Sequence, residues 1–179
     1  MSTLSREHSS FRAAGQAIVA VLHGAPLIQV DVDGVEIAWD DVPDIDRSRA
    51  DILADIAVGL GGVAAQNYFG FGVPPPDVRA SLTFHYFDAS QIADLAEVAQ
   101  LVALVDPDAA ADVSFQSFRQ VFDLMAGPEV WSAVERLAAD LLRRDVPVNE
   151  LAGYIAKPSH MEVLVPLPPN DDKGSFDVD

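Results

Sequence analysis

Hydrophobic positions along this chain recur mostly with helical spacing. Between Phe11 and Leu22 an apolar residue returns every three or four positions, which predicts an amphipathic helix. Ser10 is the expected N-cap of this helix, and Gly24 followed by Pro26 is expected to end it. We therefore expect the first element to be a helix that starts near residue 11.

A change of period follows this helix. Apolar and polar residues alternate on both sides of the dipeptide Asp33-Gly34, which predicts a β-hairpin with a two-residue turn. In that register Val32 pairs with Val35, and the apolar residues of both strands share one face. The hairpin is the only sheet that the pattern predicts with clear turn chemistry.

Helical spacing returns after residue 47, and stop signals divide the rest of the chain. Segment 82–87 is compatible with an edge strand or a loop. The expected helices are one over 47–67, one capped by Asp88, one opening at Asp106-Pro107, one after Gly127-Pro128, and a short one from Asn149. The sequence thus predicts a mainly α fold of about six helices with one small antiparallel β-hairpin. We expect one domain over 1–157 and an acidic, proline-rich mobile tail over 158–179.

Three glycines lie inside the helix predicted over 47–67, at positions 59, 61 and 62. Each glycine in a helix interior costs about 1 kcal/mol relative to alanine, so three of them need a structural reason. The most direct reason is close approach of another helix or strand to this one.

Composition narrows the possible partners. The chain has 28 acidic residues against 11 lysines and arginines, a formal net charge of −17. Such a surface repels phosphates, and no basic stripe is present, so we expect no nucleic-acid binding. A protein partner or a homo-oligomer stays possible, including a partner with a basic surface.

The same composition bears on compartment and covalent chemistry. The chain has no cysteine, which excludes disulfides and thiolate ligands and fits a reducing cytoplasm. The first ten residues lack the basic stretch and the apolar run of a signal peptide. We expect no apolar segment to reach the ~20 residues that a bilayer crossing requires. A cytoplasmic location without direct membrane insertion is therefore expected.

Three stretches, taken in order, resemble the peptidase domain of the FtsH family of ATP-dependent zinc metalloproteases. They are residues 12–20, 56–70 and 130–142. In the first, Ala14, Gly15 and Ala17 match the family's His-Glu-Ala-Gly-His-Ala helix. The second is similar to an apolar helix that carries Gly, Arg and Ala-Ala-Glu before a closing Phe-Gly, and the third to the family's late helix. The resemblance implies an FtsH-peptidase-like helical domain.

The residues that would perform zinc-peptidase chemistry are replaced in this chain. A zincin helix binds the metal through two histidines four positions apart, and the glutamate after the first histidine activates water. The matching positions hold Arg12, Ala13 and Gln16. Arginine is always cationic and cannot ligate zinc, and alanine cannot accept a proton. We expect neither bound zinc nor another cofactor, and no peptidase catalysis.

The family's third ligand is an aspartate near the start of a later helix. The alternatives for its position are Asp88, Gln91 and Asp94, and a match to Gln91 would mean that this ligand is also lost. A relocated metal site would need His85 with Asp88, which have i, i+3 spacing, although such a pair is more often a cap beside a surface imidazole. The other histidines, His8, His23 and His160, are expected before the first helix, in its last turn and in the tail.

The favoured hypothesis is a catalytically inactive zinc-metallopeptidase-like domain with a binding or scaffolding role. The alternatives are a hydrolase with a relocated or metal-independent site, and an acidic helical regulatory or interaction domain unrelated to peptidases. If the first helix derives from a zincin helix, Arg12 and Gln16 lie on one face that looks toward the start of the helix containing Asp88, Gln91 and Asp94. Arg12 is then expected to form an ion pair with a carboxylate there.

Overall fold

The computed structural model describes residues 3–38, 46–71, 89–108 and 110–155. The predicted tail, segment 82–87, and the residues Asp88, His85 and His160 lie outside this part. The described elements are α1 (Thr3–His23), β1 (Leu27–Asp31), β2 (Gly34–Ile37), α2 (Arg49–Phe71), α4 (Ala89–Val105), α5 (Ala110–Met125), α6 (Pro128–Leu141) and the 3₁₀-helix η2 (Val148–Gly153). The fold is mainly helical with one small antiparallel sheet of two strands, as the sequence predicted.

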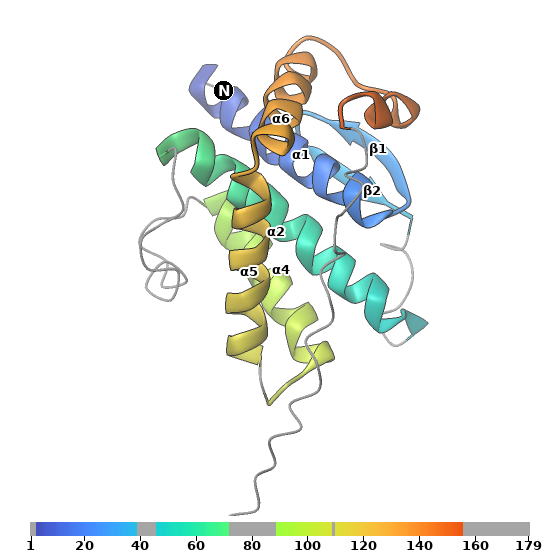
Figure 1. Ribbon diagram of the computed structural model, residues 1–179, viewed down its shortest axis with the longest axis vertical. Coiled ribbons are helices and arrows are strands. Elements are labelled where there is room, and N and C mark those ends of the chain that lie inside the picture. Colours follow the sequence, from blue (N-terminus) through green and yellow to red (C-terminus); the bar gives the residue numbers. More distant parts are fainter. Residues whose placement is uncertain (1–2, 39–45, 72–88, 109, 156–179) are drawn as a thin grey trace, which may run out of the picture.

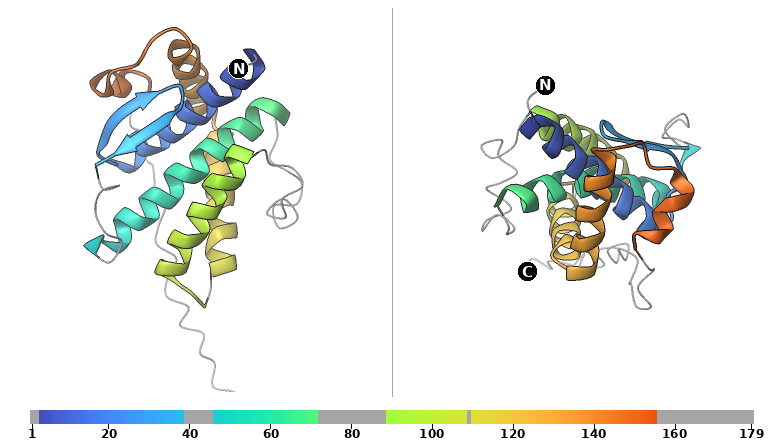
Figure 2. Two further views of the ribbon diagram at one scale, coloured as in Figure 1. Left: turned by 180° about the vertical axis from the view of Figure 1, so that it is seen from behind. Right: turned by 90° about the horizontal axis from the view of Figure 1, so that it is seen from above.

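Two crossing helices, α1 and α2, form the centre of the molecule (Figure 1). α4 and α5 pack against α2, whereas α6 and the hairpin pack against α1. Seen from behind, the hairpin, α1, α2 and α4 follow one another across one side of the molecule (Figure 2). This arrangement brings the middle of α1, the hairpin turn and the first half of α4 close together.

Small residues allow α1 and α2 to approach closely. A Cβ atom on Gly61 would lie 2.7 Å from Cγ2 of Val19 and 2.9 Å from the carbonyl oxygen of Gly15. A Cβ atom on Gly15 would lie 2.5 Å from Cβ of Ala65. Real side chains do not tolerate such distances, so these positions accept only glycine. The expected reason for the glycines within α2 is thereby confirmed.

α1 begins at Thr3, about two turns before the predicted start. Ser10 is inside the helix, is fully buried, and donates from Oγ to the carbonyl oxygen of Glu7 at 2.8 Å, so its prediction as N-cap was wrong. The buried hydroxyl group of Ser10 therefore has its hydrogen-bond partner within its own helix. The end of the helix was predicted correctly: Gly24 has φ 71°, and the N–H of Ala25 donates to the carbonyl oxygen of Ala20 at 2.9 Å.

The hairpin is present, but its register differs from the prediction. Val30 pairs with Val35 and Asp31 with Gly34, and an irregularity lies between Leu27 and Gln29. Oδ1 of Asp31 accepts the N–H groups of Asp33 and Gly34 at 2.7 and 3.2 Å. These hydrogen bonds from Asp31 place the turn one residue closer to the N-terminus than predicted. The prediction considered only the dipeptide Asp33-Gly34 and not the side chain of Asp31.

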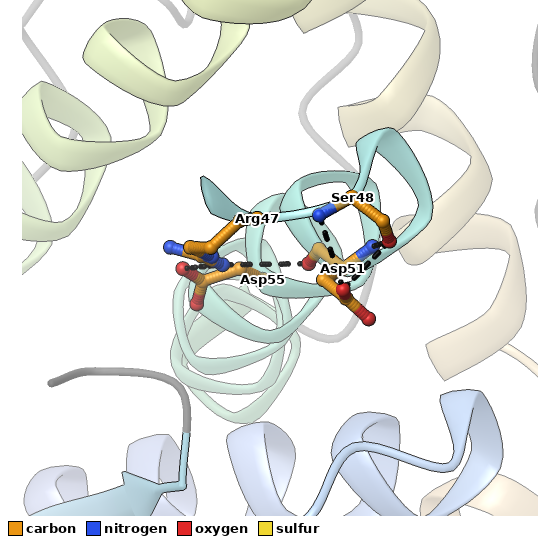
Figure 3. Close-up of polar contacts among 4 residues, drawn as sticks. All are labelled: Arg47, Ser48, Asp51 and Asp55. Carbon is orange, nitrogen blue, oxygen red and sulfur yellow. Dashed lines mark hydrogen bonds and ion pairs between the residues drawn. The ribbon is translucent and has the colours of Figure 1, made fainter. Parts of the chain in front are cut away.

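A capping box fixes the N-terminus of α2 (Figure 3). Oγ of Ser48 accepts the N–H of Asp51 at 3.2 Å, and Oδ2 of Asp51 accepts the N–H of Ser48 at 3.3 Å. By length and composition, Arg49–Gly70 is also apolar enough to cross a membrane, with a mean hydropathy of 1.2. The expectation that no segment reaches that length was therefore wrong. Because 72% of that window is buried inside the domain, the helix is accounted for as a core helix.

The last three elements complete the core: α5 packs against α2, and α6 and η2 pack against α1. α5 begins at Ala110 rather than at Pro107, and Oδ1 of Asp106 accepts the N–H of Asp108 at 3.2 Å. Its buried face carries Phe118, Val121, Phe122 and Met125.

A short 3₁₀-helix, η2, stands where the sequence predicted a sixth helix. Tyr154 holds this segment on α6 through its hydroxyl, which donates to Oδ2 of Asp140 at 2.5 Å, and through its carbonyl oxygen, which accepts from Arg136. Burial and the hydrogen bond to Asp140 raise the pKa of Tyr154.

Candidate functional site

Arg12 and Gln16 lie one turn apart on α1, and both line the same pocket. Gly62 of α2 lies beneath their aliphatic stems. A Cβ atom at Gly62 would be 2.9 Å from Cγ of Gln16 and 3.0 Å from Cγ of Arg12. The absence of a side chain at Gly62 thus lets the two polar side chains lie along α2 and extend toward α4 and the hairpin.

Arg12 forms a bidentate ion pair with Asp94. Its Nε donates to Oδ2 at 2.7 Å and its Nη2 to Oδ1 at 2.5 Å, across a separation of 82 residues. Its Nη1 also donates to the carbonyl oxygen of Asp33 at 3.0 Å. One guanidinium therefore joins α1 to α4 and to the hairpin turn. The expected pairing of Arg12 with a carboxylate of the helix after Asp88 is confirmed, and the partner is Asp94.

The other two candidates for the third-ligand position remain without a described side chain. Gln91 lies in the first turn of α4, and only its backbone is described. Asp88 lies outside the described residues. Asp94 is 6% exposed, so its carboxylate is one of the few buried charges of the described chain. A buried carboxylate requires a paired cation or a set of hydrogen bonds, and Arg12 supplies both.

The pocket has a volume of about 200 Å³ and lies between α1, β2, α2 and α4. Its polar lining consists of Arg12, Gln16, Asp33, Asp55, Asp94 and Glu97, and its apolar wall includes Val35, Ile37, Val58, Val98 and Leu101. Four acids and one arginine give this lining a formal net charge of −3. The pocket therefore combines an apolar wall with an excess of negative charge.

A second arginine neutralises part of this charge from outside the lining. Nη2 of Arg47 donates to Oδ2 of Asp55 at 2.8 Å and to the carbonyl oxygen of Asp51 at 3.4 Å (Figure 3). The side chain of Arg47 is 5% exposed. This pair fixes the Asp55 carboxylate on the α2 side of the pocket while the capping box holds the backbone around it.

Gln16 lines the pocket and carries a buried side-chain oxygen that lacks a hydrogen bond. The residue is 7% exposed, and its Oε1 has no hydrogen-bond partner in the described part of the chain. A buried acceptor without a partner costs about 1–3 kcal/mol. A leucine or methionine at this position would avoid that cost, so stability alone does not explain a glutamine here.

The positions of the zincin motif can be compared directly with this geometry. Arg12 occupies the space between α1 and α4 with its own positive charge, and Gln16 stands one turn further along. Ala13, which the resemblance aligns with the general base, is fully buried within the hydrophobic core. Among the described residues, no group of three or more His, Asp or Glu side chains is placed to hold a metal ion.

The described histidines do not contribute to the pocket. His8 lies within α1 rather than before it, and its ring packs edge-on against Phe69 at a centroid distance of 5.5 Å. His23 is in the last turn of α1, as predicted, but burial lowers its pKa, and its Nε2 has no described partner. It therefore does not act as the helix-terminal cation that its position suggested.

Several pocket residues were not recognised as candidates in the sequence. Glu97 has i, i+3 spacing from Asp94, which places both acids on one face of α4, and this signal is readable once Asp94 is chosen. Asp55 carries no such signal, because its place depends on the angle between α1 and α2. Asp33 contributes a backbone carbonyl group, which no side-chain pattern reveals.

Comparison with family models finds no match to the sequence, and comparison with curated proteins finds none either.

Proposed function

We propose that this chain is a catalytically inactive zinc-metallopeptidase-like domain that acts by binding. The observation that carries the proposal is the bidentate pair of Arg12 with Asp94, one turn from the buried Gln16. In a zincin site, the metal cation would lie between the motif helix and a carboxylate of the later helix. Here a guanidinium joins the corresponding helices, so the attraction is kept and the metal is unnecessary.

The proposal assigns the third-ligand position to Asp94. Asp94 faces the motif helix directly, whereas nothing describes the side chain of Gln91. Under this assignment the acidic ligand is retained, and only the two histidines and the glutamate are replaced. A metal ligand that no longer holds a metal keeps its place because Arg12 compensates its buried charge.

The alternative of a hydrolase with a relocated site has less support among the described residues. Ser10 is buried and its hydroxyl donates to its own helix, and the described histidines lie away from the pocket. No observation favours hydrolysis over binding, so binding is the function that the geometry supports best.

The deciding experiment restores the metal site. Arg12→His with Gln16→His places two imidazoles one turn apart beside Asp94, which makes a three-ligand zincin set. We expect this double variant to bind one equivalent of zinc in calorimetry, to give the absorption of tetrahedral cobalt, and to melt at a higher temperature with zinc than without it. The unaltered protein should show no stoichiometric zinc and no response to a chelator.

Adding Asp94→Asn to the double variant is the matched control, because it keeps both imidazoles and removes the carboxylate. We expect zinc affinity to fall at least tenfold. Zinc binding that ignores Asp94, or no binding by the double variant at all, would contradict the descent of this site from a zincin. In that case the domain is an acidic helical interaction module unrelated to peptidases.

Catalysis is a separate question from binding zinc. The double variant lacks a general base, so it should bind zinc and still fail to cleave peptides. Introducing Ala13→Glu would supply a base, but Ala13 is fully buried in the core. We expect this third substitution to lower the free energy of unfolding by several kcal/mol (about 2–5) unless the glutamate reaches the zinc.

A further inference from the structure

The hairpin turn contains the dipeptide Asp33-Gly34, which is the only Asp-Gly pair in the chain. In such a pair the backbone nitrogen of glycine can attack the side-chain carboxyl carbon of aspartate, since glycine has no side chain to hinder the approach. Asp33 is exposed, and a Cβ atom on Gly34 would find no described atom beyond its chain neighbours closer than 3.6 Å. The dipeptide is therefore both chemically reactive and sterically accessible.

Two side chains hold the peptide group between Asp33 and Gly34 from opposite ends. Nη1 of Arg12 donates to the carbonyl oxygen of Asp33 at 3.0 Å, and the N–H of Gly34 donates to Oδ1 of Asp31 at 3.2 Å. The carboxylate of Asp31 is itself fixed, because its Oδ2 accepts a hydrogen bond from Nε2 of Gln29 at 2.8 Å. One peptide group thus has a cation at its oxygen and a carboxylate at its N–H.

We propose that Asp33 converts to isoaspartate in the folded protein, through a succinimide whose formation Arg12 and Asp31 promote. Oδ1 of Asp31 takes the proton from the nitrogen of Gly34, and Arg12 stabilises the negative charge that develops on the peptide oxygen. The nitrogen then bonds to Cγ of the protonated Asp33 side chain, and the bond from Cγ to its hydroxyl oxygen breaks. The hydroxyl group leaves with the proton as one water molecule, so the step needs no further reactant.

The position of Arg12 also decides how the succinimide ring opens. Water can add to either ring carbonyl, at Cγ of Asp33 or at its main-chain carbonyl carbon. Arg12 polarises the main-chain carbonyl, so addition there is favoured, and the chain then continues through Cγ as isoaspartate. The water lost in the first step is regained, and a free α-carboxylate forms at the oxygen that Arg12 already contacts. The modification therefore adds a negative charge beside the Arg12–Asp94 pair.

The same hydrogen bonds also restrain the turn, and restraint alone would slow ring closure. The two effects predict opposite rates, which peptide mapping by mass spectrometry with electron-transfer fragmentation can measure. The full chain, kept below its melting temperature, is compared with a synthetic peptide of residues 27–38 in the same buffer. We expect isoaspartate to form about threefold faster in the full chain, because the folded structure holds both promoting side chains in place. A rate no higher than that of the peptide would overturn the proposal.

Two aspartate variants test the base. Asp31→Asn keeps a side-chain oxygen that can accept the N–H of Gly34 but cannot take its proton, so we expect the rate to fall about tenfold. Asp106→Asn is the matched control, because Asp106 also accepts a backbone N–H, that of Asp108, in another part of the chain. This control should leave the rate unchanged within error. Equal rates in the two variants would overturn the assignment of Asp31 as the base.

The products of ring opening test the cation. In heavy-oxygen water both products carry the label, so the ratio of isoaspartate to newly formed aspartate can be measured. We expect Arg12→Met to lower this ratio to that of the synthetic peptide, and an unchanged ratio would overturn the assignment of Arg12. Asp33→Glu would require a larger ring and should form no product, which identifies the reacting residue. None of these results bears on zinc binding by the Arg12→His, Gln16→His variant, so the two proposals fail independently.

Discussion

The face of α1 toward α2 and the face toward α4 differ in packing and in polarity. The face toward α2 carries Gly15, Ala14 and Val19, is fully buried, and meets Gly61 at a distance that excludes any Cβ atom. The face toward α4 carries Arg12 and Gln16, which surround a pocket, and one of them keeps a buried acceptor without a described partner. One helix therefore holds both a helix crossing at backbone distance and a buried polar atom without a described partner.

This difference shows which part of the sequence serves stability and which part calls for a function. The crossing with α2 follows the ordinary logic of close packing, in which every residue is explained by its neighbours. The face of α1 that lines the pocket lowers the stability of the fold, because Gln16 and the buried charges are costly to bury. Apolar residues of similar volume would avoid this cost. Positions where a chain breaks such rules without local gain are where functional sites concentrate.

The largest effect is expected at the crossing. Gly61→Ala puts a Cβ atom 2.7 Å from Cγ2 of Val19 and 2.9 Å from the carbonyl oxygen of Gly15, so the two helices must separate. We expect the free energy of unfolding in urea to fall by about 3 kcal/mol. Gly70→Ala, on the same helix with open space around it, should instead stabilise by up to about 1 kcal/mol. Equal effects at both positions would disprove the tight crossing.

The crossing was largely predictable from sequence, and its glycines were the signal. Three glycines at 59, 61 and 62 contradict helix propensity, so their presence in α2 implied a neighbour at backbone distance. What the sequence did not show was which helix approaches. The partner, Gly15, was visible only as a residue of the resembling motif. Periodicity gives the face of a helix but not the rotation between two helices.

The second effect concerns the ion pair on the other face. Arg12→Met leaves the carboxylate of Asp94, which is 6% exposed, without its bidentate partner, so we expect a loss of about 2–3 kcal/mol. Combining it with Asp94→Leu removes both charges and should recover most of that loss. Arg119→Met breaks an exposed pair with Asp123 and should cost only a few tenths of a kcal/mol. Strict additivity in the Arg12–Asp94 double-mutant cycle would show that the pair is not coupled.

The site was predicted in part, and its missing pieces have physical reasons. The i, i+4 spacing of Arg12 and Gln16 placed both on one helical face, and the resemblance to the zincin motif implied a carboxylate partner for Arg12. It could not choose among Asp88, Gln91 and Asp94, since the choice depends on where α4 lies along α2. The hairpin register moved by one residue for a similar reason: a side chain, Asp31, took hydrogen bonds that turn statistics assign to the backbone.

A smaller effect of opposite sign is expected at Gln16. Gln16→Met removes a buried acceptor that has no described partner and keeps the volume of the side chain, so we expect stabilisation by about 1 kcal/mol. Gln66→Met is a useful comparison, because Gln66 also has a buried Oε1 without a partner, yet its Nε2 donates to the carbonyl oxygen of His8 at 3.2 Å. That variant loses a hydrogen bond and should gain less. Destabilisation by Gln16→Met in thermal melting would show that its carboxamide supports the fold instead.

The smallest effect lies at the C-terminal end of α1, in His23. Burial lowers the pKa of His23 below its ordinary 6.5, so the folded state favours the neutral ring while the unfolded state binds a proton near pH 6.5. The stabilising contribution is therefore complete above about pH 6.5 and is lost progressively as the pH falls below it. Urea unfolding at several values between pH 5 and 8 should show a decrease of stability toward acid that His23→Gln reduces. His8→Gln is the matched control, because it makes the same substitution at the other described histidine of α1. A pH profile that His23→Gln does not change would mean that the imidazole is hydrated in the folded state and that this end of α1 is open to water.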